Sequence, residues 1–244
     1  LADTPGALEC VEHFTRRMSG AEVNVAIGLT RLGFPVEYLT RLGDDPFGHY
    51  IEQALKDNGI GTNLLTYDTV YRTGIQLKEY VEDGHDPVAP YYRKGSAASH
   101  LSAQEIDALD LEEIGLVHVT GIPPALSKEA REATYRLMER AREAQIPVTL
   151  DPNLRPALWE NGETMRNVLN DLANYADVVL PGIGECEILA GTTDKEKAAD
   201  FYHQKGAALV VIKDGKNGAY VSEKKENGEV VRDMIPGYPV KKVV

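Results

Sequence analysis

The stretch between residues 102 and 212 alternates short β-branched runs with amphipathic segments, and this alternation restricts the fold more than any other feature. The amphipathic segments carry helix signals, such as Ser102 with Glu105 as a capping box and Gly191 after an apolar run. Strand followed by helix, repeated along a chain, implies a mostly parallel sheet with helices on both faces. Four strands of this α/β sheet are expected at residues 116–120, 148–151, 178–180 and 209–212.

Two other regions have the pattern of antiparallel pairs. Residues 73–81 and 88–93 are extended runs on either side of a polar turn at residues 82–86. They predict a small sheet that stands off the main fold and can serve as a lid. Near the end of the chain, Asn227 and Gly228 separate two further runs, which predicts a type I′ hairpin and an antiparallel edge to the main sheet.

The N-terminal part of the chain has weaker signals. We expect an edge strand at residues 9–18 and a helix that starts near Ser19 and ends at Gly33. A strand, a helix and a second strand are expected at residues 36–39, 50–58 and 64–67. The predicted organisation is a small β lid of residues 1–18 and 72–94 and an α/β core of residues 19–71 and 95–244.

The charge balance excludes some classes of partner. The chain has 26 Lys and Arg against 38 Asp and Glu, a formal net charge of -12. Such a field repels nucleic acid and anionic membranes, so we expect neither as a partner and favour small-molecule chemistry. Cys10 and Cys186 have no metal-binding spacing, and with no signal peptide in the sequence they favour a cytoplasmic protein. The histidines are dispersed, so no histidine-bound metal is expected.

The clearest candidate site follows the predicted strand at residues 148–151. Asp151, Asn153 and Arg155 come directly after its apolar residues, where prolines forbid further regular structure. Ligands of open α/β sheets bind beyond the carboxyl ends of the strands, and an Arg fork can hold a carboxylate or phosphate in two places. Taken alone, the residues fit equally well a capped turn with Arg155 paired to a surface acid.

Two glycine-containing segments are weaker candidates. The helix expected after Ser19 starts with Gly20, where a ligand can approach the backbone closely, and Asn24 lies in its first turn. In isolation, that segment is better explained as an ordinary helix start capped by Ser19. Residues 213–218 follow a predicted strand, and their glycines and Lys213 suit phosphate binding, although the same residues also fit a hairpin turn. No Walker A motif is present.

Taken in order, five segments resemble the ribokinase-like (PfkB) carbohydrate kinases. They are residues 19–33, 91–97, 120–122, 150–159 and 213–218, and the resemblance extends over nearly the whole chain. Within the family, the runs at 91–97 and 151–159 are most similar to the members that act on the sugar acid 2-keto-3-deoxygluconate. The resemblance implies a Rossmann-like core with a small β lid, transfer of the γ-phosphoryl of ATP to a sugar hydroxyl, a need for Mg²⁺, and pairing of copies through the lid.

The resemblance also implies roles for particular residues. The sugar acid is expected to contact Gly20, Asn24, Tyr91, Arg93, Ile122 and Arg155, with Arg155 also stabilising charge during transfer. ATP is expected to contact Asn153, Lys213, Gly215 and Gly218, and the metal is expected near Glu185. Two arginines can bind a carboxylate and reject a neutral sugar, which would leave their buried charges unpaired.

The chain departs from the family pattern at several places. Gly182 replaces the Asn of the Asn-x-x-Glu motif that ends at Glu185, and Gln76 lies where an aromatic residue is expected in the sugar-acid kinases. The glycine-rich motif that ends in the catalytic Asp is expected immediately after Val244, and the opening core strand is also missing. The sequence is therefore expected to lack both ends of the complete protein, and no catalytic base is assigned.

The expected activity is ATP-dependent phosphorylation of the 6-hydroxyl of 2-keto-3-deoxygluconate. A related kinase for fructose, ribose or 5-dehydro-2-deoxygluconate is the nearest alternative, and Arg93 separates the two because a neutral sugar does not need it. A non-catalytic sugar- or nucleotide-binding protein is a further alternative. A nicotinamide-dependent oxidoreductase is disfavoured because no GxGxxG motif follows a strand.

Overall fold

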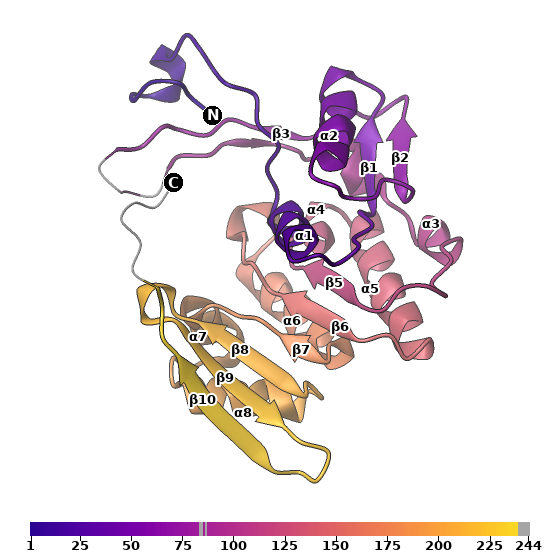
Figure 1. Cartoon of the computed structure of the whole chain (residues 1–244). Helices are drawn as coiled ribbons and strands as arrows, with labels where there is room; N and C mark the ends of the chain where they lie inside the picture. Colours follow the sequence, from indigo (N-terminus) through magenta and orange to yellow (C-terminus); the bar gives the residue numbers. More distant parts are fainter. Residues whose placement is uncertain (83–84, 86, 239–244) are drawn as a thin grey trace. The chain divides into compact units, whose positions relative to one another are not determined.

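The computed structural model of the chain describes residues 1–82, 85 and 87–238 (Figure 1). The chain forms two compact units, the first of residues Leu1–Leu101 and the second beginning at Ser102, and each is described by itself. Part of the turn predicted at residues 82–86 and all of residues 239–244 lie outside the described residues.

The first unit has a small core between two helices and a pair of strands. The helices are α1 (Ala21–Arg31) and α2 (Pro46–Asp57), and the strands β1 (Thr40–Gly43) and β2 (Leu65–Asp68) pair in parallel. The apolar side chains that the elements share are Val23, Ala26, Leu55 and Ile60.

Two boundaries in this unit differ from the predictions. The strand predicted at residues 36–39 is β1, four residues later, because Val36 and Tyr38 pack against the helical core while only Glu37 forms an isolated bridge, to Gly61. The start of α2 is also earlier than predicted, since Asp45 caps it by accepting hydrogen bonds from Phe47 N at 3.0 Å and Gly48 N at 2.9 Å.

The predicted antiparallel pair is present but short. Strands β3 (Ile75–Gln76) and β4 (Tyr91–Tyr92) pair antiparallel, and two backbone hydrogen bonds, from Leu77 N to Pro90 O and from Glu79 N to Val88 O, continue the pairing toward the turn. The edge strand predicted at residues 9–18 is wrong. A 3₁₀ turn, η1 (Leu8–Cys10), interrupts that segment, whose polar and apolar residues alternate too irregularly for a regular strand.

The second unit contains the main sheet, whose strand order is β10-β9-β8-β7-β6-β5. Strands β5 to β8 are parallel and the last two are antiparallel, which confirms the mostly parallel sheet and its antiparallel edge. The predicted type I′ turn is wrong: Lys225 N donates to Glu229 O across a three-residue loop in which Gly228, but not Asn227, has a positive φ. The strands are β5 (Val117–Thr120), β6 (Val148–Asp151), β7 (Val178–Val179), β8 (Leu209–Lys213), β9 (Ala219–Lys224) and β10 (Val230–Ile235).

Helices connect the parallel strands of this unit, and Figure 1 shows α6, α7 and α8 behind the sheet. The helices are α3 (Ala103–Asp107), α4 (Pro123–Leu126), α5 (Lys128–Glu143), α6 (Gly162–Leu172), α7 (Ile183–Ala190) and α8 (Lys195–Gln204). Alternate strand residues, including Val148, Leu150, Val210 and Ile212, belong to one core cluster with helix residues such as Leu169. This unit also has the 3₁₀ turns η3 (Pro156–Leu158), η4 (Ala173–Tyr175) and η5 (Gly215–Asn217), while η2 (Ala97–His100) belongs to the first unit.

Two helix starts in this unit are confirmed. Ser102 and Glu105 form the predicted capping box, and Ser127 caps α5 by accepting a hydrogen bond from Ala130 N. The capping box predicts a helix from Ser102 through Glu113, but α3 ends at Asp107. Asp110 instead accepts a hydrogen bond from Glu112 N, an alternative that short acidic side chains offer to the helical backbone. Within the described residues, none of the helices combines the length and the apolar character that crossing a membrane requires.

Candidate functional site

In the first unit, the start of α1 is linked to strand β3 by a side-chain hydrogen bond. Gly20 is the N-cap residue of the helix, and the Gln76 side-chain amide donates to the Ser19 hydroxyl at 2.9 Å. The alternative in which Ser19 caps the helix is therefore wrong. Asn24 lies one turn into α1 with an exposed side chain, and its backbone N–H donates to Gly20 O.

The other predicted sugar-binding residues of this unit are Tyr91 in strand β4 and Arg93 directly after it. Tyr91 is the direct partner of Gln76 in the antiparallel pair, and directly opposed residues share one face of a sheet. The Arg93 guanidinium lies 4.0 Å from the centroid of the Tyr91 ring, an arrangement that orients the fork through a cation–π contact. Gly74 leaves room for Arg93, whose Cβ would lie 2.9 Å from a Cβ added at Gly74. The first unit therefore connects the start of α1, through Gln76, to the pair Tyr91 and Arg93.

In the second unit, the end of β6 forms a tight turn. The Asp151 carboxylate accepts a hydrogen bond from Asn153 N at 3.2 Å, and Asn153 has a φ of +40°. Asn is among the few side chains that tolerate this left-handed region. The Arg155 guanidinium donates to Leu154 O at 2.8 Å, so this contact fixes it to its own loop.

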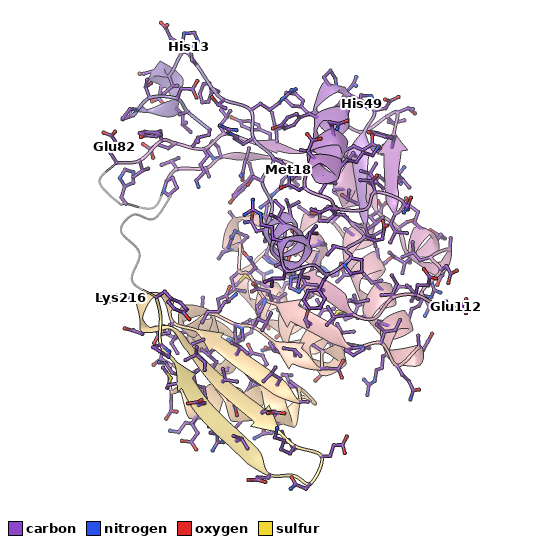
Figure 2. All side chains as sticks on the ribbon, viewed as in Figure 1. His13, Met18, His49, Glu82, Glu112 and Lys216 are labelled. Atoms are coloured by element: carbon purple, nitrogen blue, oxygen red, sulfur yellow. The ribbon has the colours of Figure 1, made fainter. Side chains whose placement is uncertain are left out.

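The end of β8 meets the end of β6 through an ion pair. Lys213 Nζ lies 2.7 Å from Asp151 Oδ2. After Lys213 the chain turns through η5, and Gly218 accepts a hydrogen bond from Asp214 N at its carbonyl. Gly218 has a φ of +93°, and a Cβ there would lie 1.9 Å from Ile235 O, so this position requires glycine. Figure 2 shows the neighbouring Lys216 at this end of the sheet.

The loop after β8 has a second ion pair. Lys195 Nζ lies 2.6 Å from the Asp214 carboxylate. The hydrogen bond from Lys195 is the main reason that the pKa of Asp214 is lower than usual, so the loop keeps a negative charge beside Lys213 at neutral pH. Gly215 lies in the same turn with a φ of +50° and open space around its Cα.

Glu185 connects the β6 loop to the start of α7. Its Oε1 accepts a hydrogen bond from Leu154 N at 2.7 Å, and its Oε2 accepts one from Gly182 N at 2.6 Å. The second bond is the carboxylate half of a capping box, which Gly182 can form without a side chain of its own. The bond to Leu154 spans 31 residues, and no local sequence signal indicates it.

The loop after β5 approaches the same turn closely. Gly121 N donates to Asp151 O, and a Cβ added to Gly121 would lie 2.0 Å from Pro152 O. Ile122 is buried, and its backbone N–H donates to the Thr120 hydroxyl at 3.1 Å. The glycine is thus required for the backbones that follow β5 and β6 to lie in contact.

The donor chemistry at Glu185 fits a hard cation held with its waters. Among the described side chains of His, Cys, Asp and Glu, no group of three or more could hold a metal ion. Mg²⁺ generally keeps several waters and binds one or two carboxylates together with phosphates. Each Glu185 oxygen already accepts one backbone N–H and keeps a further lone pair. Glu185 can therefore contribute one carboxylate to such a shell.

The predicted site residues thus form two groups. Within the second unit, the structure brings Asn153, Lys213 and Glu185 to the carboxyl ends of β6, β7 and β8, with Asp151 between the first two. Within the first unit it brings Tyr91 and Arg93 together and connects Gln76 to Ser19, next to Gly20. The structure adds the connecting roles of Asp151 and Ser19, which sequence spacing alone does not reveal.

Comparison with known proteins identifies the family. Residues 2–237 match the pfkB family carbohydrate kinases. The 2-dehydro-3-deoxygluconokinase of Bacillus subtilis (strain 168) is 44% identical over 220 residues, which are 90% of this chain and 68% of that protein.

Two solved structures have the same fold. The PfkB protein from Polaromonas sp. JS666 is 45% identical with a TM-score of 0.91, and the match covers 98% of this chain and 79% of that one. The fructokinase from Vibrio cholerae O395, in its fructose-, ADP- and calcium-bound form, is 27% identical with a TM-score of 0.81, over 94% of this chain and 72% of that one. The predicted ribokinase-like fold is confirmed, and the chain belongs to the pfkB family of carbohydrate kinases.

Proposed function

We propose that this protein transfers the γ-phosphoryl group of ATP to the 6-hydroxyl of 2-keto-3-deoxygluconate, the sugar acid also called 2-dehydro-3-deoxygluconate. The observation that carries the proposal is the 44% identity to the Bacillus subtilis 2-dehydro-3-deoxygluconokinase over most of this chain. The arginine that stacks on Tyr91 supports it, because a guanidinium suits a sugar with a carboxylate and has no counterpart in a neutral hexose.

In this proposal, the sugar acid is bound by Gly20, Asn24, Tyr91, Arg93, Ile122 and Arg155. The backbone around Gly20 and the Asn24 amide bind hydroxyls, while Arg93 and Arg155 bind the acid. The stacking of Arg93 on Tyr91 supports its role, because an ordered fork loses less entropy when it binds. Arg155 also stabilises the negative charge that spreads over the transferred phosphoryl group.

The nucleotide is assigned to the second unit. Asn153, Lys213, Gly215 and Gly218 contact ATP, and Glu185 holds the hydration shell of Mg²⁺, which neutralises phosphate charge when it is bound. Phosphoryl transfer depends mainly on positioning and charge neutralisation. The glycine positions support this assignment because open space at Gly215 lets a ligand approach the backbone.

We further propose that residues 1–18 and 72–94 act as a lid over the sugar, that copies of the protein pair through this lid, and that the protein works in the cytoplasm. The hydrogen bond from Ala2 N to Lys78 O supports one lid from the two segments. Exposed Tyr92 and Val88 support an interface there. Tyr92→Ser is expected to shift the sedimentation of the protein toward the monomer, and an unchanged oligomer would contradict the interface.

Substrate preference tests the assignment directly. ADP release is measured with 2-keto-3-deoxygluconate, fructose, ribose and 5-dehydro-2-deoxygluconate as acceptors. We expect Arg93→Gln to lower kcat/KM for the sugar acid by roughly 100-fold, since a charge-assisted contact of about 3 kcal/mol is lost, and to change fructose turnover little. Lys205→Gln is the matched control, because Lys205 Nζ lies 5.1 Å from the centroid of the Phe201 ring in another cation–π contact, outside the proposed lid and the assigned site residues.

A fructokinase is the second candidate, and the polar Gln76 on β3 together with the structural match to the Vibrio cholerae fructokinase favours it. Ready turnover of fructose without turnover of the sugar acid would establish it and reject the proposal. Nucleotide binding with no phosphorylated product from any sugar would instead indicate a binding protein.

A further inference from the structure

The geometry points to Asp151 as a positioning residue for nucleotide binding: its two carboxylate oxygens hold Lys213 and Asn153, the two side chains assigned to ATP, in one fixed arrangement. This inference rests on the proposed nucleotide role of the second unit. Asp151 itself is assigned no contact with ATP, sugar or metal.

The first oxygen acts on Lys213. Asp151 ends β6 and Lys213 ends β8, and β7 lies between these strands in the sheet. Neighbouring strands are about 4.8 Å apart, so the Lys213 side chain has to cross the line of β7 to bring Nζ within 2.7 Å of Asp151. Beyond the end of β7 the chain reaches Gly182, which bridges to Lys213 and has no side chain to obstruct the lysine. The ion pair therefore fixes a long, flexible side chain in one direction.

The second oxygen acts on Asn153. Asp151 Oδ1 accepts the backbone N–H of Asn153 at 3.2 Å, and this turn holds Asn153 at a φ of +40°. A non-glycine residue in the left-handed region stores strain, which persists only where surrounding contacts impose it. Asp151 supplies one of these contacts.

The negative charge of Asp151 by itself disfavours the binding of phosphate groups nearby, so a carboxylate here needs a compensating role. Phosphate groups carry negative charge, and Asp151 adds another negative charge beside the residues assigned to them. A half-exposed ion pair adds little to stability, and the Lys213 side chain is 46% exposed. A pre-ordered lysine, however, loses less conformational entropy when it binds phosphate.

The isosteric variant Asp151→Asn separates these two effects because they have opposite signs. Removal of a negative charge alone would leave nucleotide binding unchanged or make it tighter. Loss of positioning makes it weaker. We expect the Kd for ADP with Mg²⁺, measured by calorimetry without sugar, to rise roughly tenfold, and the KM for ATP to rise with it while the KM for the sugar stays within about twofold.

A double-mutant cycle tests whether the effect passes through Lys213. We expect Lys213→Met to weaken ADP binding as well, and Asp151→Asn to weaken it little further when Lys213 is already Met. Full additivity of the two losses would overturn the coupling. Glu223→Gln is the matched control, because Glu223 forms a 2.6 Å pair with Lys225, a lysine as exposed as Lys213, near the opposite end of β9. The ADP affinity of the Glu223→Gln variant is expected to stay unchanged.

Each outcome has one meaning. ADP affinity of Asp151→Asn equal to or tighter than that of the unmodified protein overturns the positioning role alone. Normal ADP binding without turnover of the sugar acid overturns only the sugar assignment, and an unmodified protein that binds no nucleotide overturns both. If Asp151→Asn does not fold, Asp151→Glu takes its place, since a longer carboxylate displaces Lys213. Unchanged ADP affinity in that folded variant overturns the inference.

Discussion

Glu185 and Leu154 lie 31 residues apart in the chain, yet the Glu185 carboxylate accepts the Leu154 backbone N–H at 2.7 Å. Because the other carboxylate oxygen accepts Gly182 N–H, a single side chain holds the turn after β6 against the first turn of α7. The shape of the predicted nucleotide loop therefore depends on a helix that begins at Ile183.

Glu185→Gln should weaken this connection. A glutamine has one acceptor oxygen, so one of the two backbone N–H groups loses its partner. We expect the free energy of unfolding in urea to fall by about 1–2 kcal/mol. Glu187→Gln, at an exposed position of the same helix, is the control and should change it by less than about 0.5 kcal/mol. Equal effects in the two variants would show that the connection contributes nothing.

Asp45 should make stability depend on pH. Burial by itself raises the pKa of Asp45, but hydrogen bonds from the N–H groups of Thr73, Gly48 and Phe47 favour the carboxylate more, and its pKa lies below the usual value. A lowered pKa in the folded state adds stability above the unfolded pKa of about 3.9, and this stability is lost as the pH falls through the folded pKa. Asp45→Asn should therefore be less stable than the unmodified protein at pH 7.

The measurement is urea unfolding at several pH values. We expect a difference of about 1 kcal/mol at pH 7, which shrinks as the pH falls below about 4. Asp57→Asn is the control, because Asp57 is exposed at the C-terminal end of the same helix, where a negative charge opposes the helix dipole. A difference for Asp45→Asn that is constant from pH 7 to pH 2 would contradict the role of its charge.

The two cysteines should differ in reactivity. Burial, with a smaller contribution from the charge of Glu185, raises the pKa of the Cys186 thiol to about 12, whereas Cys10 is exposed. The thiolate is the reactive form, so iodoacetamide at pH 8 should label Cys10 and leave Cys186 unmodified in the folded protein. Peptide mass spectrometry measures the labelling, and denaturation should make both residues react. Rapid labelling of Cys186 in the folded protein would show that α7 opens readily.

Two glycines should respond oppositely to alanine. Gly121→Ala places a Cβ 2.0 Å from Pro152 O, so the turns after β5 and β6 must move apart. We expect a loss of at least about 2 kcal/mol in unfolding free energy and a lower activity. Gly184 lies within α7, and a Cβ added there would point into open space. Gly184→Ala should therefore raise the free energy of unfolding by about 0.5–1 kcal/mol. Thermal unfolding of both variants decides the matter, and a neutral Gly121→Ala would contradict the close approach.

The sequence was a good guide to elements set by local chemistry. The capping box of Ser102 and Glu105 depends on residues three apart, and the hairpin around Asn227 and Gly228 depends on one loop, so both were predicted and are present. The type I′ turn predicted for that hairpin is wrong, because Gly228 has a positive φ and Asn227 does not. Boundaries that depend on distant partners were less accurate. Strand β1 begins at Thr40 because its ladder partner is Leu65, and nothing in residues 36–39 specifies that register.

The candidate site shows the same division. The sequence placed Asp151, Asn153 and Lys213 at strand ends, where the structure has them. It did not reveal that Asp151 contacts both Asn153 and Lys213, because the order of the strands in the sheet, which brings Lys213 to Asp151, is set only in the folded protein. The link from Gln76 to Ser19 spans 57 residues and was also missed, although the absence of the expected aromatic residue at position 76 was a signal that this position differs.

Strands β8, β9 and β10 are consecutive in the chain and adjacent in the sheet, whereas β5 to β8 are joined through helices. Short connections have a small entropic cost of loop closure, so β8, β9 and β10 can pair early, before the long crossover connections bring β5, β6 and β7 into register. The antiparallel edge is thus expected to serve as a template on which β7, β6 and β5 are added one after another, in the reverse of their order of synthesis.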